Sequence, residues 1–136
     1  MAEISRSATL WPKDQMENYQ WLDELLLKQP ATEKEFQPAW QAYKYLLRGK
    51  MYAYIGINDQ NKRPIITLKL EPLYSDMLHR EYHDIVSGYY MNKLHWSTVY
   101  LDSEVPREVI SDMVHASHKL VLASLSKKVQ QEILEV

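Results

Sequence analysis

The chain has 136 residues, of which 46% are hydrophobic and 25% charged, and its formal net charge is −2. These values are typical of one globular domain, and the charge argues against a strongly basic nucleic-acid-binding protein. The absence of cysteine excludes disulfides and thiolate chemistry. No apolar run approaches the roughly 18 residues of a membrane-spanning helix, and the run at residues 8–11 is too short for a signal peptide. We therefore expect a cytoplasmic protein without a membrane partner.

The N-terminal region predicts an irregular arm followed by a helix. Residues 1–13 show no clear period, so we place the folded domain at residues 14–136. Asp14 followed by Glu17 fits the Asp form of the capping box, which marks a helix start. Hydrophobic side chains at helical spacing continue to about Lys28. We therefore expect the domain to begin with a helix.

The next part of the chain predicts a connector and three strands. Residues 31–42 have no period, and we expect Phe36 and Trp40 to hold this connector against the core. Apolar and β-branched runs then predict strands over residues 43–47, 51–57 and 65–70. A tight turn and a polar hairpin loop separate these strands.

The second half of the chain alternates helices and strands. The expected elements, in chain order, are a helix over residues 72–82, strands over 85–90 and 96–101, a long helix from Pro106 and a short helix after Ser126. The complete order is α-β3-α-β2-α-α. This order predicts an α+β fold, a single antiparallel sheet of about five strands with helices packed on one face.

Strand alternation divides the predicted sheet into two faces. The aliphatic face, which the helices should cover, holds Met51, Ala53, Ile55, Ile57, Ile66, Leu68, Leu70, Val99 and Leu101. The opposite face is aromatic, hydroxylated and partly basic; it holds Tyr52, Tyr54, Thr67, Lys69, Trp96, Thr98 and Tyr100. We expect any ligand to bind this second face.

Aromatic and basic residues on an open sheet suit nucleic-acid binding. Such rings can stack on bases, at roughly 1–3 kcal/mol per base, while cations hold the phosphates. The candidate nucleic-acid or ligand-binding residues are Lys44, Tyr52, Tyr54, Lys69, Asn92, Lys93, His95 and Trp96. Two alternatives stay open, because tyrosine and tryptophan are also common in ordinary strands. The face could instead be buried in a homodimer interface, or be covered by the N-terminal arm.

Two polar hairpin tips are further candidates for phosphate binding. Asn92, Lys93 and His95 lie at one tip, and Lys62 and Arg63 at the other. A pair of such tips can hold the phosphates of a duplex as two wings. The alternative is that hairpin tips are polar because they lie in water.

Four segments form a pattern across the second half of the chain: TLKLEP at residues 67–72, GYYMNKLHWSTV at 88–99, LD at 101–102 and ASLSKK at 123–128. This pattern resembles the MmcQ/YjbR family of small bacterial proteins, over about residues 16–130. The resemblance implies a frataxin-like (CyaY-like) fold and DNA binding through two hairpin wings. His118 and Ser126 depart from the family pattern, in which an aromatic residue and proline are more common.

The sequence predicts neither catalysis nor a cofactor. It contains no nucleophile motif and no glycine-rich phosphate loop, so we expect a protein that is not an enzyme. Two histidine pairs, His79 with His83 and His115 with His118, have near-helical spacing but no third metal ligand beside them. We interpret all four as surface histidines. A frataxin-like fold would also suggest an acidic iron-binding ridge, and the carboxylates available for it here are few.

Overall fold

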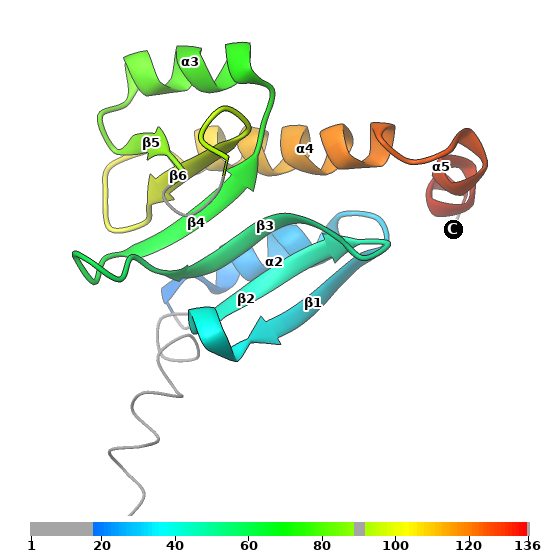
Figure 1. Cartoon of the computed structure of the whole chain (residues 1–136), viewed down its shortest axis with the longest axis horizontal. Helices are drawn as coiled ribbons and strands as arrows, with labels where there is room; N and C mark the ends of the chain where they lie inside the picture. The colour runs from blue at the N-terminus through cyan, green and yellow to red at the C-terminus, as the bar shows by residue number, and fades with distance from the viewer. Residues whose placement is uncertain (1–17, 89–91, 136) are drawn as a thin grey trace, which may run out of the picture.

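Six strands form one antiparallel sheet in the part of the chain that the computed structural model describes, residues 18–88 and 92–135 (Figure 1). The strands are β1 (Thr32–Gln37), β2 (Ala42–Leu47), β3 (Lys50–Ile57), β4 (Pro64–Lys69), β5 (Ile85–Ser87) and β6 (Trp96–Tyr100). Their order across the sheet is β1-β2-β3-β4-β6-β5. The predicted single antiparallel sheet is confirmed, with one strand more than expected.

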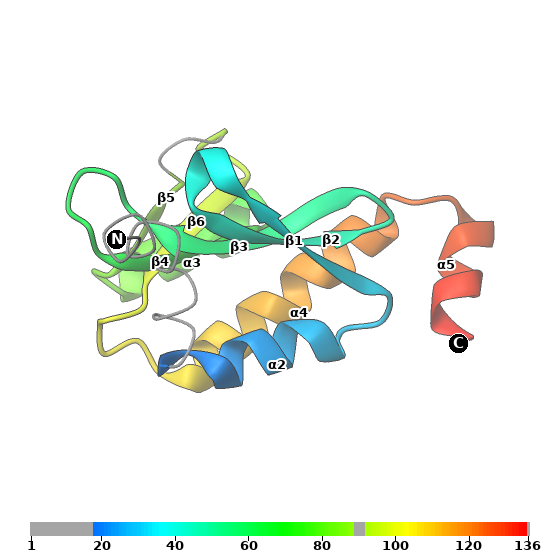
Figure 2. The same ribbon diagram turned by 90° about the horizontal axis from the view of Figure 1, so that it is seen from below.

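Two helices with several buried residues cover one face of this sheet. α2 (Gln20–Lys28) and α4 (Arg107–Ala123) lie side by side below it in Figure 2. α3 (Pro72–Glu81) lies beyond β5, and α5 (Lys127–Leu134) projects past the end of α4 (Figure 1). The predicted α+β class is therefore confirmed. No helix within the described ranges is long and apolar enough to cross a membrane.

An edge strand occupies most of the segment that we predicted to be a connector. β1 and a short 3₁₀ helix, η1 (Pro38–Trp40), both fall within residues 31–42. β1 is mostly polar and exposed, and among the described strands it pairs only with β2. Charged residues on an edge strand hinder pairing with other chains, but they also remove the apolar alternation that identifies a strand. The connector prediction was wrong for this reason.

Some predictions fall outside the described residues. The irregular arm over residues 1–13 and the capping box of Asp14 and Glu17 do so entirely. The predicted strand over residues 85–90 does so in part, and its described portion contains β5.

The core lies between the sheet and the helices α2 and α4. Leu22 and Leu26 are fully buried because residues four apart lie on the same side of a helix. The strands and α4 contribute further aliphatic side chains, among them Ile55, Ile66, Leu68, Val99, Met113 and Val114. Each fully buried side chain of this kind contributes about 1.5–3 kcal/mol relative to an exposed one. The aliphatic face is thus the helix-covered face, as predicted, with an exception in β3.

A β-bulge changes the direction of two side chains in β3. Tyr45 pairs with Ala53, but Leu46 pairs with Met51, so Tyr52 has no residue opposite it. An extra residue of this kind shifts the alternation of the strand by one. Tyr52 is therefore buried in the main core, while Met51 packs against the smaller cluster on the other face. The predicted faces of Tyr52 and Met51 were wrong.

The antiparallel order gives the sheet two different ends. The β3–β4 hairpin and the start of α4 form one end, the hairpin end (Figures 1 and 2). The β2–β3 turn, the β5–β6 loop and α5 form the other, the α5 end. The six residues of β4 separate the two ends by roughly 20 Å.

Candidate binding surface

The face of the sheet opposite α2 and α4, the outer face, carries the strand residues of the predicted site. Lys44 pairs with Tyr54, and Tyr54 pairs with Thr67. Two residues further along β4, Lys69 pairs with Trp96. Cross-strand partners point to the same side of a sheet. Tyr54, Lys69 and Trp96 therefore share one face, as strand alternation predicted.

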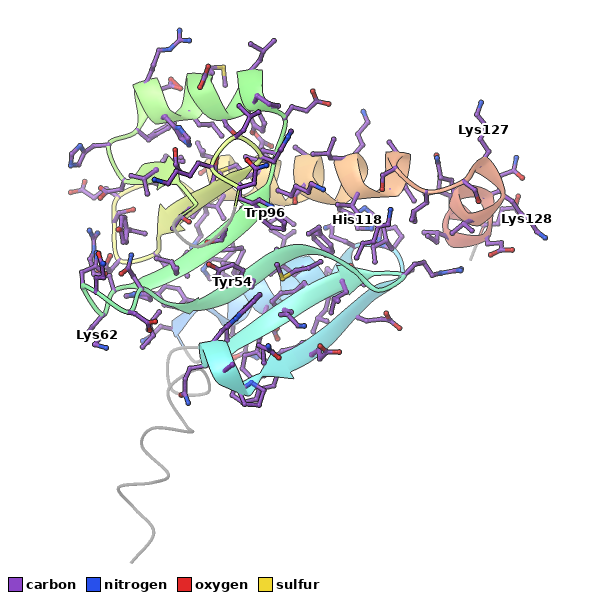
Figure 3. All side chains as sticks on the ribbon, in the orientation of Figure 1. Tyr54, Lys62, Trp96, His118, Lys127 and Lys128 are labelled. Carbon is purple, nitrogen blue, oxygen red and sulfur yellow. The ribbon has the colours of Figure 1, made fainter. Side chains whose placement is uncertain are left out.

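Two aromatic rings of this face, those of Tyr54 and Trp96, are covered. Tyr54 is 5% exposed and Trp96 is 9% exposed, and both are labelled in Figure 3. The ring of Trp40, from η1, lies 5.4 Å from the ring of Tyr54. Burial raises the pKa of Tyr54, and a hydrogen bond with Thr67 partly opposes that effect. A base could not stack on the rings of Tyr54 or Trp96 unless the covering side chains moved.

The two basic residues of the outer face have different surroundings. Lys44 Nζ lies 2.8 Å from Glu35 Oε1 on the neighbouring strand, and 5.9 Å from the ring centre of Trp40. Its charge is therefore neutralised within the protein. Lys69 is half-buried and forms no ion pair with any residue that the structure describes.

The described part of the β5–β6 loop presents a lysine at the α5 end. Asn92 Oδ1 accepts a hydrogen bond from Leu94 N at 2.9 Å, and Asn92 O accepts one from Trp96 N at 3.0 Å. Asn92 therefore shapes the turn. His95 is half-buried, and its carbonyl accepts from Leu70 N at 2.8 Å, which joins the loop to β4. Lys93 is exposed and, among the described residues, has no carboxylate partner.

The arginine at the other hairpin tip is held by internal contacts. Arg63 binds Asp102 through two nitrogens, Nη2 at 2.8 Å and Nε at 3.0 Å from Oδ1. Asp84 lies 3.5 Å away, and the guanidinium stacks 3.9 Å above the ring of Tyr100. The hydrogen bond to Asp102 raises the pKa of Arg63 further above its ordinary value. Arg63 is therefore committed to the fold, while its neighbour Lys62 is exposed.

The two predicted wings do not face each other. The tip with Lys62 lies at the hairpin end and the loop with Lys93 at the α5 end, with β4 between them. A ligand would have to extend along the sheet to touch both. The prediction that they act as a pair at one site is not supported by this arrangement.

A buried hydrogen-bond network explains why Tyr52 and His118 are inside. Tyr52 Oη donates to Leu26 O at 3.2 Å and lies 2.7 Å from Thr32 Oγ1. The ring of His118 meets that of Tyr52 edge-on at 5.4 Å, and its Nε2 donates to Pro30 O at 2.8 Å. Burial raises the pKa of Tyr52 to about 12. The surface position predicted for His118 was wrong, because the side chain packs as an aromatic ring.

The other histidine pair does not assemble a metal site. His79 Nε2 lies 3.0 Å from Ser97 Oγ, which in turn donates to Ser75 Oγ at 3.0 Å. Burial lowers the pKa of His79, and Asp76 partly opposes that shift. His83 is exposed. Across the described ranges, no group of three or more His, Asp or Glu side chains is placed to hold a metal ion.

A small cavity lies on the helix side at the hairpin end, between the start of α2 and the start of α4. Its volume is about 170 Å³, and Tyr19, Trp21 and Arg107 are among its lining residues. The guanidinium of Arg107 lies over the ring of Trp21, 4.7 Å from its centre, so this cation at the edge of the cavity makes a cation–π contact within the protein. None of the predicted site residues lines this cavity.

Two exposed lysines that sequence reasoning left out of the site lie at the α5 end. Lys127 and Lys128 begin α5, directly after the capping residue Ser126. They fall within the ASLSKK segment, which contributes to the family resemblance. Their position in the first turn of a helix, where acidic residues are usual, was the signal that could have identified them.

The fold and surface define a small α+β protein with one open antiparallel sheet. A sequence model of the YjbR family matches residues 27–120, and the chain belongs to that family.

Proteins from several bacteria are similar to this chain. YjbR of Escherichia coli K12 is 26% identical over 110 residues, which are 81% of this chain and 92% of that protein. YbdF of Escherichia coli O157:H7 is 31% identical over 111 residues, 80% of this chain and 88% of that protein. Both are described as uncharacterised.

Solved structures share the fold. The crystal structure of Deinococcus radiodurans DR2400, a DUF419 protein, has a TM-score of 0.73 and 26% identity, covering 82% of this chain and 84% of that one. A crystal structure from Pseudomonas syringae has a TM-score of 0.61 and 26% identity, covering 74% and 96%. The frataxin-like relationship and the DNA-binding role stay predictions.

Proposed function

We propose that this YjbR-family protein binds DNA through phosphate contacts made by cations around the β5–β6 loop, the half-buried Lys69 and the exposed Lys93. The supporting observation is the difference among its basic residues. Lys44 and Arg63 are neutralised by carboxylates of the protein itself, whereas Lys69 and Lys93 have no such partner in the described ranges. Cations without an internal partner are the ones available to an external phosphate.

The buried rings limit the kind of DNA recognition that this surface offers. Tyr54 and Trp96 cannot stack on bases while they are covered, so the contacts are with the backbone. Backbone contacts carry little sequence information, and each one releases counterions. The observed affinity should therefore fall with salt, by roughly 0.9 logarithmic units per contacted phosphate for each tenfold increase in salt concentration.

Fluorescence anisotropy with a labelled DNA duplex tests this proposal. Binding should be measurable at about 50 mM salt and much weaker at about 200 mM. Lys93→Glu should weaken it, whereas Lys62→Glu, the same charge change at the hairpin end, should have a much smaller effect. Absence of binding at low salt, or equal losses in the two variants, would refute the proposed site.

A second candidate function, protein interaction, is favoured by exposed apolar side chains. Leu73 is 83% exposed and Met77 is 50% exposed, and their spacing of four residues places both on the outward side of α3. Leu94 of the β5–β6 loop is 60% exposed. The homodimer predicted through Tyr52, Tyr54, Trp96 and Tyr100 loses its basis, because the first three of these rings are already buried within one chain.

Sedimentation velocity separates this candidate from DNA binding. If α3 mediates association, a species larger than the monomer should form with rising protein concentration, and Leu73→Glu should abolish it. A chain that stays monomeric at all concentrations would remove self-association through α3. The same variant should leave the salt-dependent binding of a duplex unchanged.

A further inference from the structure

The α5 end of the molecule carries a group of cations that the proposed DNA-binding site does not include. This group, the α5 patch, consists of Arg48, Lys50, Lys127 and Lys128, all of which are exposed. Figure 3 shows the side chains of Lys127 and Lys128 pointing away from the body of the protein in different directions. Among the residues that the structure describes, one carboxylate, that of Glu132, forms an ion pair with the patch, through Arg48 Nη2 at 3.4 Å.

The fold holds these four residues in place. Arg48 and Gly49 both have positive φ angles, 52° and 81°, as the tight β2–β3 turn requires. Lys50 Nζ donates to Ser124 Oγ at 3.4 Å, so the turn contacts the segment that connects α4 to α5. The side chain of Ile133 is buried in the main core and fixes α5 to it. The patch is therefore a defined surface formed by a turn and a docked helix.

The positions of Lys127 and Lys128 are unfavourable for the helix itself. Ser126 Oγ accepts a hydrogen bond from Val129 N at 3.2 Å, which marks the start of α5. Cations in the first turn oppose the helix dipole and so destabilise the helix slightly. No acidic side chain of the described ranges lies within ion-pair distance of either lysine. The two lysines therefore destabilise the start of α5 and gain no ion pair within the described protein. Local destabilisation of this kind is typical of residues that serve a function.

The α5 patch lies at the same end of the sheet as the basic residues of the proposed site. β3 begins at Lys50 and β4 ends at Lys69, and the two strands are antiparallel neighbours. The loop with Lys93 reaches the same end of the sheet through its contact with Leu70. At the hairpin end, by contrast, Asp84 and Asp102 neutralise Arg63.

We infer that a DNA backbone bound near Lys69 and Lys93 continues across the α5 patch, with Lys50, Lys127 and Lys128 supplying a second group of phosphate contacts. This inference rests on the proposed function and adds the path that the DNA takes over the protein. The cations are spread along one end of the sheet and do not surround a single enclosed site. A ligand that contacts all of them must therefore carry repeated phosphates, as a DNA backbone does. The path runs along the α5 end and leaves the hairpin end uncovered.

The salt dependence of duplex binding tests the inference. The double variant Lys127→Gln/Lys128→Gln should bind more weakly, and its logarithmic salt slope should be smaller by about 1.8, which is two phosphate contacts at about 0.9 each. Lys128→Gln and Lys62→Gln form a matched pair, since each removes one exposed lysine from opposite ends of the sheet. The first should lower affinity and salt slope, and the second should change neither.

A melting curve of the double variant tests whether weaker DNA binding results from loss of the fold. Since the two lysines oppose the dipole of α5, the double variant should melt at the same temperature as the original chain or slightly above it. If the original chain binds the duplex and Lys93→Glu weakens that binding, but the double variant keeps the full salt slope, the path over α5 is overturned and the proposed function stands. If the original chain does not bind the duplex at all, both fail.

Discussion

The two ends of the sheet are held together in different ways. At the hairpin end, surface ion pairs join the strands, because Arg63 connects the β3–β4 hairpin to Asp84 and Asp102 around β5 and β6. At the α5 end, buried hydrogen bonds between neutral groups, those of Tyr52 and His118, join α2, the sheet and α4, and the ion pair of Arg48 with Glu132 is peripheral and exposed. The charges of the α5 end are mostly outside this network and face solvent.

This difference shows that the charges available to a ligand cannot be counted from the sequence. Lys44 and Arg63 are both bound to carboxylates of the protein. Lys127 and Lys128 are exposed and form no ion pair with any residue in the described ranges. Availability depends on whether the fold places a carboxylate beside each cation, which is a tertiary property.

The largest expected effect comes from breaking the buried network at the α5 end. Tyr52→Ala should lower the free energy of unfolding by about 3–5 kcal/mol, because it removes a fully buried aromatic side chain from the core. Tyr52→Phe, which keeps the ring and loses only the hydroxyl, should lower it by about 1–2 kcal/mol. Urea titrations of both variants give these values. A near-neutral Tyr52→Ala would mean that the side chain lies on the outer face after all.

The same residue shows where sequence reasoning reached its limit. Alternation placed Tyr54, Lys69 and Trp96 on one face correctly, because a regular strand has a side-chain period of two. Tyr52 was misplaced because the bulge depends on its register with β2, which no local pattern reveals. Ser117 Oγ donates to Tyr52 O at 2.6 Å and so satisfies a carbonyl within the bulge. That partner is 65 residues away in the chain.

Predictions about the site failed where they depended on the surroundings of a side chain. The sequence identified the sheet, most of the strands and the helices, because hydrophobic periodicity determines them. It did not reveal that Trp40 covers Tyr54, or that His118 bonds to Pro30. Both contacts join segments whose proximity results from packing of the whole domain.

The second effect is a loss of stability at alkaline pH that originates at the α5 end. The pKa of Tyr52 in the fold is raised to about 12, from an ordinary value of 10.0. The protonated hydroxyl is thus favoured in the folded state, and its contribution is complete below pH 10. It is lost as the pH rises from 10 to about 12, by roughly 2–3 kcal/mol. Urea titrations along this range should show a shallower loss for Tyr52→Phe than for the original chain.

Tyr45 should contribute to that alkaline loss in the same direction. Burial raises its pKa most, and its hydrogen bond to Asp23 Oδ1 at 2.6 Å raises it further. The Tyr52→Phe variant should therefore retain part of the pH dependence. A profile with no difference between the variant and the original chain would contradict the role assigned to Tyr52.

A smaller effect is expected from the histidine of the same network. His118→Phe keeps a ring against Tyr52 but removes the donor to Pro30 O. Loss of one hydrogen bond of this kind should lower the free energy of unfolding by about 1 kcal/mol. His115→Phe, an exposed position on the same helix, is the matched control and should be near neutral. Equal effects of the two changes would show that the bond to Pro30 contributes nothing.

The smallest effect should come from the hairpin end, and it alone should depend on salt. Asp102→Asn removes the main partner of Arg63. Both side chains are more than one-third exposed, Asp102 at 42% and Arg63 at 35%. Exposed ion pairs contribute about 0.2–1 kcal/mol, and salt screens them. The loss should therefore be measurable in urea titrations at low salt and shrink as salt is added, whereas the loss from His118→Phe should not change. If both losses shrank equally with salt, the proposed contrast between a charged hairpin end and a neutral buried α5 end would be wrong.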